Sequence, residues 1–187
     1  MERRVVITGI GALTPIGNNT AEFWDGLKNG KNGIAHITKF DTEAVQSKAV
    51  CAGELKNFDP TTVVEKKETK RLDMFSIYGM AVADEAVKMS GIDLESIDKH
   101  KFGVVFGSGI GGLTTIEEQG RRLVEKGINK IAPLFIPMAI SNMAAGNIAI
   151  RFGARGTCID VVTACASSTN CIGEAFRNIK HGYSDYI

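Results

Sequence analysis

Residues 156–171 read GTCIDVVTACASSTNC, and within them the sequence changes from a strand pattern to a helix pattern. The segment Thr157 to Val162 is short and rich in β-branched residues, which favours a buried strand. Further on, apolar residues recur at helical spacing while charged residues fall off their stripe; the apolar ones are Ile172, Ala175, Phe176 and Ile179. Cys165 therefore falls at or near the N-terminus of a helix.

Cys165 is a candidate catalytic nucleophile because of this position. A thiol attacks as its thiolate, and the unpaired N–H groups at a helix start stabilise negative charge. The small residues Ala164, Ala166 and Ser167 allow a tight turn and the close approach of a substrate, as in other strand-turn-helix nucleophile elbows. Local sequence leaves an alternative open, since a free cysteine is commonly a small buried hydrophobe.

The rest of the chain alternates between strand and helix patterns. Strands are predicted at Arg3 to Thr8, Ala49 to Leu55 and Phe102 to Phe106, and a further one begins at Tyr186-Ile187. Helices are predicted at residues 21–28, 72–90, 113–125 and 141–152, and a helical region begins at Asp59-Pro60. Strands separated by helices indicate an α/β fold, with a mainly parallel sheet flanked by helices.

The composition is that of a globular domain with a substantial core. The 187 residues are 44% hydrophobic and 23% charged, with a formal net charge of +1. This balance gives no overall attraction to nucleic acid or to a membrane surface. The four cysteines form no C-x-x-C pair, so metal-ligand spacing is absent, and without a secretion signal we expect reduced thiols in the cytoplasm.

Two apolar stretches resemble export or membrane segments. Residues 1–17 begin with charged residues before an apolar run, but glycines and Pro15 interrupt the run and no A-x-A-like cleavage site follows. Residues 131–150 carry no charge and approach spanning length, yet they contain two prolines and two asparagines. A helix buried between protein layers explains this second stretch better.

Three segments together carry a family resemblance. They are VVITGIGALTPIG at residues 5–17, GSGIGG at 107–112 and VTACASS at 162–168. In this order they resemble the first strand and loop, the second glycine-rich turn and the nucleophile segment of the β-ketoacyl-acyl-carrier-protein synthases, the condensing enzymes of fatty-acid synthesis. The elongating, synthase II members are the most similar.

The resemblance implies a thiolase-like, layered αβαβα fold, of which this chain is one incomplete pseudo-repeat. Residues 1–187 would form the N-terminal half of a ketosynthase, truncated before its last strands. The second half of family members supplies two histidines, in H-G-T and G-H-N motifs, and a lysine; neither motif occurs here. The histidines present, His36 in a loop, His100 before a strand and His181 at a helix end, are interpreted as structural. We therefore expect the chain alone to be inactive in condensation.

The resemblance also implies the chemistry. Cys165 would accept an acyl chain from acyl carrier protein as a thioester, which then condenses with malonyl-carrier protein as CO₂ leaves. No metal or organic cofactor is implied, since the phosphopantetheine arm belongs to the carrier. The enzyme, an acyltransferase, is expected to be a cytoplasmic homodimer that pairs the strand at Thr157 to Val162 with its twin across a two-fold axis.

Further residues acquire roles through the same resemblance. Ile110 would line the acyl pocket, and Phe135 would close it from across the dimer interface, with ordinary core as the alternative for Phe135. Lys67, Lys70 and Arg71 match positions that meet the acidic carrier protein. Without the family, the mixed-sign run that contains them indicates a solvated helix face.

Other functions remain open at this stage. Residues 107–112 also satisfy G-x-G-x-x-G after a strand and before a helix, the pattern of a dinucleotide-binding domain. That pattern lies past residue 100 instead of in a first βαβ unit, and no acidic residue ends a following strand at the expected distance. Within the same fold, a polyketide-type ketosynthase is the nearest alternative, whereas a chain-length factor would lack the nucleophile.

Overall fold

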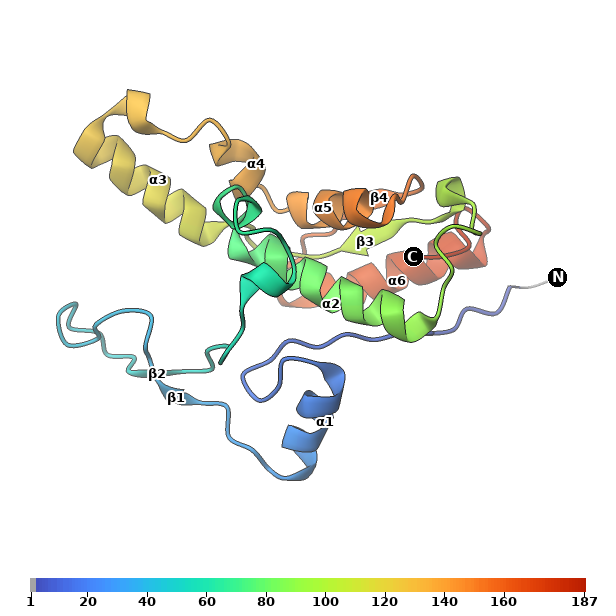
Figure 1. Cartoon of the computed structure of the whole chain (residues 1–187), viewed down its shortest axis with the longest axis horizontal. Coiled ribbons are helices and arrows are strands. Elements are labelled where there is room, and N and C mark those ends of the chain that lie inside the picture. Colours follow the sequence, from blue (N-terminus) through green and yellow to red (C-terminus); the bar gives the residue numbers. More distant parts are fainter. Residues whose placement is uncertain (1–2) are drawn as a thin grey trace. The chain divides into compact units, whose positions relative to one another are not determined.

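The computed structural model describes residues 3–187, which form two compact units. The first unit comprises residues 3–7, 60–80 and 91–187, and the second comprises residues 8–59 and 81–90. All the candidate site residues lie in the first unit. Figure 1 labels the elements along the chain.

The first unit contains two strands, β3 and β4, and the helices around them. Its elements are α2 (Met74–Ser90, up to Met80), β3 (Val104–Phe106), α3 (Leu113–Lys126), α4 (Phe135–Ala139), α5 (Met143–Phe152), β4 (Cys158–Asp160) and α6 (Ser167–Lys180). Short 3-10 turns connect them: η1 (Pro60–Thr62), η2 (Glu68–Lys70), η3 (Lys99–Lys101), η4 (Ile128–Lys130) and η5 (Ala164–Ala166).

β3 and β4 pair in parallel. Val104 stands opposite Cys158 and Phe106 opposite Asp160, and a long crossover that contains α3, α4 and α5 joins the two strands, as parallel pairing requires. On the other side of β3, Tyr186 forms a parallel bridge with Phe102. The predicted strands at residues 102–106 and 157–162 are thus confirmed with shorter bounds, whereas the strand predicted to begin at Tyr186 is present only as this single bridge. No strand among residues 3–187 covers the outer edge of β4.

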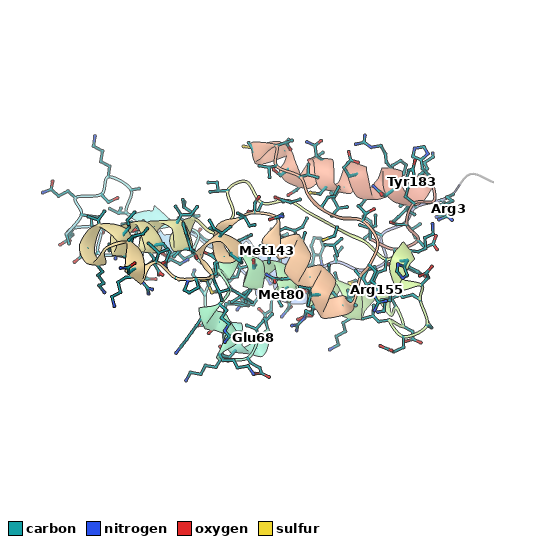
Figure 2. The ribbon with its side chains drawn as sticks, turned by 90° about the horizontal axis from the view of Figure 1, so that it is seen from above. Arg3, Glu68, Met80, Met143, Arg155 and Tyr183 are labelled. Carbon is teal, nitrogen blue, oxygen red and sulfur yellow. The ribbon has the colours of Figure 1, made fainter. Side chains whose placement is uncertain are left out.

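Helices cover both faces of this strand pair. Figure 2 shows α6 on one side, and α5 with the first part of α2 on the other. The core between them includes Ile77, Ala144 and Ala145, all at most 1% exposed. A Cβ on Gly79 of α2 would lie 2.9 Å from the Phe106 ring, so the missing side chain lets this helix pack closely against β3. The result is the layered α/β arrangement that the sequence predicted.

The predicted helices are largely confirmed, and glycines end two of them as expected. α2 begins at Met74 instead of residue 72 and ends before Gly91, and α5 begins at Met143 and ends before Gly153. Both glycines have φ near +66°, a left-handed conformation that glycine adopts without a Cβ penalty. The region after Asp59 forms 3-10 turns, η1 and η2, before α2 begins.

The predicted strand at Arg3 to Thr8 is wrong. These residues lie outside any helix or strand, and Val6 and Ile7 are 57% and 82% exposed. Their β-branched pattern is real, but no strand among residues 3–187 offers them a ladder of hydrogen bonds. Arg3 instead donates to the Asp185 carboxylate at 2.6 Å and to the Ser184 carbonyl at 3.3 Å, which places it beside Tyr183 in Figure 2.

The uncharged stretch at residues 131–150 forms two helices, α4 and α5, separated by residues 140–142. α5 buries one face through four residues, Ala144, Ala145, Ile148 and Ala149, while Ile150 is 79% exposed. The prediction of a buried helix is therefore correct for one face only. Among residues 3–187, none of the helices combines the length and the apolar character needed to cross a membrane.

The second unit is built around α1 (Thr20–Lys28), the short antiparallel pair β1 (Ala35–His36) and β2 (Cys51–Ala52), and residues 81–90 of α2. The Asn19 side chain caps α1 by accepting the Glu22 N–H. The predicted strand at residues 49–55 is confirmed but shorter. His36 lies in β1, so its placement in a loop is corrected, because Ala35 and His36 find partners in β2.

Candidate active site

Cys165 lies on the turn that connects β4 to α6, as the sequence predicted. β4 ends at Asp160, η5 spans Ala164–Ala166, and α6 begins at Ser167, two residues after the cysteine. Cys165 is exposed. The preceding Ala164 has φ of +50°, a left-handed conformation that costs a non-glycine residue roughly 1–2 kcal/mol. The structure thus places an exposed thiol on a strained turn directly before a helix.

Hydrogen bonds from the first turn of α6 hold this strained turn closed. The buried Ser167 hydroxyl accepts the Thr163 N–H at 2.9 Å and donates to the Ala164 carbonyl at 2.8 Å. The Asn170 amide donates to the Thr163 hydroxyl at 2.7 Å. The residues on either side of the bend are therefore fixed to the helix that follows Cys165.

The other thiols of this unit lie in different surroundings. Cys171 lies on α6, six residues after Cys165, and is buried. Burial, with a smaller contribution from the Asp160 carboxylate, raises the pKa of its thiol. Burial also raises the pKa of Cys158 on β4, although part of that residue is exposed. Both thiols therefore hold less thiolate at neutral pH than an unperturbed cysteine does.

The glycine-rich loop that follows β3, residues 107–112, lies against the turn that carries Cys165. The Ser108 N–H donates to the Asp160 carboxylate at 3.2 Å, and the Gly111 N–H donates to the Ser108 hydroxyl at 3.0 Å. A Cβ on Gly107 would lie 3.1 Å from the Ser167 Cβ and 2.9 Å from the Cys171 sulfur. The loop contacts the turn that carries Cys165 because both follow the carboxyl ends of neighbouring parallel strands. Ile110 of this loop is 64% exposed.

Phe135, the second predicted pocket residue, lies half-buried at the first position of α4. The far end of this helix contacts the glycine-rich loop, since the Gly112 N–H donates to the Ala139 carbonyl at 2.8 Å. Gly111, with φ of +84°, approaches so closely that a Cβ there would lie 2.4 Å from the same carbonyl oxygen. Backbone contacts therefore tie the element that carries Phe135 to the loop that carries Ile110.

Lys67, Lys70 and Arg71 lie on an exposed segment around η2, which we call the basic turn (residues 67–71). All three are exposed, and Lys67 pairs with Glu65 at 2.7 Å. The segment is a 3-10 turn and not a regular α-helix, but its basic residues remain on the surface. Figure 2 shows Glu68 of the same segment projecting away from α5 and α6.

Asp73 connects the basic turn to the start of α3. The Gly112 N-cap of α3 offers no side-chain acceptor, and the buried Asp73 carboxylate takes its place. One oxygen accepts both the Thr115 N–H at 3.0 Å and the Thr115 hydroxyl at 2.6 Å, while the other accepts the Phe75 N–H at 3.2 Å. Burial raises the pKa of the Tyr78 hydroxyl, and the negative charge of Asp73 raises it further.

Sequence reasoning missed the supporting residues Ser167, Asp160 and Asp73. The sequence indicates only that Ser167 is small enough for a tight turn. The contacts of its hydroxyl depend on how the turn closes in space. The contact of Asp160 could have been predicted, because it ends a predicted strand and the loops that follow neighbouring parallel strands meet at one edge of the sheet. For Asp73 the sequence holds no such pattern, because its partner Thr115 is 42 residues away.

Residues 2–187 match the family model described as "Beta-ketoacyl synthase, N-terminal domain". The chain belongs to the beta-ketoacyl synthase family. The 3-oxoacyl-[acyl-carrier-protein] synthase 2 of Synechocystis sp. is 42% identical over 185 residues, and that of Staphylococcus aureus strain COL is 45% identical over 183 residues. Each alignment covers 98% of this chain and 44% of the relative, so the chain spans less than half the length of these curated relatives.

Solved structures of ketosynthases share the fold. A beta-ketoacyl synthase from Burkholderia phymatum is 26% identical with a TM-score of 0.79, and the superposition covers 98% of this chain and 45% of that one. A type II polyketide ketosynthase, bound to the hexaketide and in complex with its acyl-carrier protein, is 23% identical with a TM-score of 0.82. That superposition covers 98% of this chain and 49% of the ketosynthase. The thiolase-like α/β fold expected for this beta-ketoacyl synthase chain is thereby confirmed.

Proposed function

We propose that the protein containing this chain is an elongating condensing enzyme of fatty-acid synthesis, in which Cys165 is the covalent nucleophile. The observation that carries the proposal is the exposed thiol on the turn between β4 and α6, in a chain whose similar curated relatives are named 3-oxoacyl-[acyl-carrier-protein] synthase 2. The substrates are an acyl thioester and a malonyl thioester of acyl carrier protein.

The reaction has two covalent steps. The Cys165 thiolate attacks the carbonyl carbon of the acyl thioester, and the carrier leaves as its own thiol after taking a proton. In the second step the malonyl carboxyl group leaves as CO₂, and the resulting enolate carbon attacks the acyl carbon on Cys165. A carbon–carbon bond forms, the cysteine thiolate is released, and the product is a 3-oxoacyl thioester of the carrier.

The backbone N–H of Cys165 is one donor for the oxyanion that forms at the acyl carbon. The first N–H groups of a helical segment lack intrahelical acceptors, and Cys165 is the second residue of η5. A second donor, and the histidines that stabilise the enolate, belong in this proposal to the part of the protein outside residues 1–187. The chain by itself therefore reaches acylation at most.

In this proposal Ile110 lines the acyl pocket of its own subunit, and Phe135 closes the pocket of the neighbouring subunit across the dimer interface. Support for Ile110 comes from its loop, which packs against the turn that carries Cys165, while the half-buried Phe135 lies on a helix that is hydrogen-bonded to that loop. An acyl chain attached to Cys165 would then run along apolar side chains.

Acyl carrier protein is the proposed partner, and the basic turn is its docking site. The exposed cations of this turn suit an acidic partner, for which surface charge chiefly raises the association rate. We further propose a cytoplasmic homodimer without metal or organic cofactor, formed through the outer edge of β4, which no strand among residues 3–187 covers.

The decisive experiment uses the full-length protein with acyl- and malonyl-carrier protein. We expect release of CO₂ and formation of a 3-oxoacyl product in the wild-type protein. Formation of the 3-oxoacyl product should be abolished by Cys165→Ala and unchanged by Cys51→Ala, which removes the exposed thiol of the second unit. Absence of both products in the wild-type protein would contradict the proposal. Products extended repeatedly without reduction would instead assign the protein to the polyketide type, a member of which shares the fold with a TM-score of 0.82.

Dinucleotide binding through residues 107–112 is disfavoured by membership of the synthase family. Titration with NAD and NADP checks this directly, and we expect no saturable binding.

A further inference from the structure

The backbone around Cys165 needs an external restraint to keep its shape. Ala164, directly before the nucleophile, has φ of +50°, and an alanine in this conformation is strained relative to the ordinary helical or extended regions. Left to itself, the turn would relax, and both the thiol and the N–H of Cys165 would move with it. The restraint must therefore come from contacts across the bend.

Ser167 provides that restraint from the first position of α6. Its side chain is only 5% exposed, and its hydroxyl bridges the two residues that precede Cys165, accepting from the Thr163 N–H at 2.9 Å and donating to the Ala164 carbonyl at 2.8 Å. Both hydrogen-bonding capacities of the hydroxyl are thus used within one turn. The close approach of Gly107, where a Cβ would lie 3.1 Å from the Ser167 Cβ, limits the room for the serine to move.

We propose that Ser167 is a positioning residue for acyl transfer: its hydroxyl closes the turn and thereby holds Cys165 in place at the start of α6. This inference rests on the proposed function for its catalytic consequence. Ser167 itself touches no reacting atom. Through its hydrogen bonds to Thr163 and Ala164, it fixes the positions of the Cys165 thiol and of the Cys165 N–H that donates to the oxyanion.

Removal of the hydroxyl has a defined expected effect. In the full-length protein, Ser167→Ala leaves the Thr163 N–H without its acceptor and allows Ala164 to leave the left-handed region. Misplacement of a reacting group by about 1 Å costs on the order of 10²-fold in rate. We expect kcat for acyl transfer from acyl-carrier protein to fall roughly 10- to 100-fold, while KM for the carrier stays within about twofold, because the basic turn is unchanged.

A readout that needs no substrate separates this inference from the proposed function. The rate of Cys165 alkylation by iodoacetamide at fixed pH, measured relative to that of the exposed Cys51, reports how the thiol is held at the start of α6. We expect this relative rate to fall at least about threefold in Ser167→Ala, because the turn that presents the thiol is no longer fixed. If the wild-type protein transferred no acyl group, the proposed function would fail, and the relative alkylation rate alone would decide the role of Ser167.

Two variants serve as references. Ser167→Thr keeps the hydroxyl but adds a methyl group at a packed site, so it is expected to recover part of both readouts relative to Ser167→Ala. Ser168→Ala, at the exposed neighbour, is expected to change neither readout. An unchanged relative alkylation rate in Ser167→Ala would overturn the proposal, as would equal behaviour of the Ala and Thr variants. Failure of Ser167→Ala to fold would also overturn it, because the serine would then be a general requirement of the structure.

Discussion

Substitution of Gly107 by alanine tests how tightly the glycine-rich loop packs against the nucleophile turn. A Cβ at this position would lie 2.9 Å from the Cys171 sulfur, 3.1 Å from the Ser167 Cβ and 3.1 Å from the Val161 carbonyl oxygen. These distances are all shorter than ordinary van der Waals contact. Since the nearest atoms belong to buried side chains and to backbone, no flexible group can move aside to make room.

The magnitude follows from overpacking in a closed site. Added methyl groups in well-packed cores typically cost about 1–3 kcal/mol, so we expect Gly107→Ala to lower the free energy of unfolding by about that amount. We also expect slower alkylation of Cys165, because the added methyl group would displace Ser167, which is hydrogen-bonded to the turn that carries Cys165. A Cβ added to Gly109 in the same loop would have no atom within 4 Å, so Gly109→Ala is the matched control, with a change within about 0.5 kcal/mol.

The assay is urea unfolding of the full-length variants, combined with the rate of iodoacetamide labelling. Cys171→Ala in the Gly107→Ala background removes the nearest contacting atom and should recover part of the loss, as a favourable coupling of at least about 0.5 kcal/mol in a double-mutant cycle. Equal stability of Gly107→Ala and Gly109→Ala would refute the close packing described here, and with it the contact between loop and nucleophile turn.

Four further outcomes are expected. Asp73→Ala should destabilise the protein by about 2–4 kcal/mol in urea unfolding, because it removes the buried acceptor at the start of α3, and Asp73→Asn should cost less. With limiting iodoacetamide at pH 7, peptide mapping should find Cys165 labelled before Cys171, since burial raises the pKa of the latter and lowers its thiolate fraction until the pH exceeds that pKa. Lys70→Glu should slow association with acyl-carrier protein several-fold at low salt, and a loss that persists at high salt would contradict a steering role. Residues 1–187 alone should form no 3-oxoacyl product when assayed in parallel with the full-length enzyme, since loss of even one oxyanion donor lowers kcat roughly 10²–10³-fold. Turnover within about tenfold of the full-length enzyme would contradict this.

The elements that sequence predicted well are those with strong local patterns. The strand leading to Cys165 and the helix after it follow from a change in apolar spacing within a few residues, and glycine at the helix ends specified where α2 and α5 stop. Here the local preference and the tertiary structure agree.

The failures arise where pairing decides the outcome. Residues 3–8 have a good strand pattern, but a strand needs a neighbour, and Ile7 is exposed in the structure. In the candidate site, the position of Cys165 between a strand and a helix was predictable from its neighbours in sequence. The hydroxyl bridge of Ser167 and the capping of α3 by Asp73 were not, since both depend on which backbone groups meet after folding.

The parallel register of β3 and β4 also bears on how the protein is made. Val104 and its partner Cys158 are 54 residues apart along the chain, so at typical synthesis rates roughly 3–10 s pass between the appearance of one strand and of its partner. During that interval β3 has no β4 to pair with, and non-local pairings of this kind form slowly even afterwards. The turn that carries the nucleophile is consequently among the last features of residues 91–187 to take shape during synthesis, and a chain released before residue 158 would expose an unpaired β3 to other nascent chains.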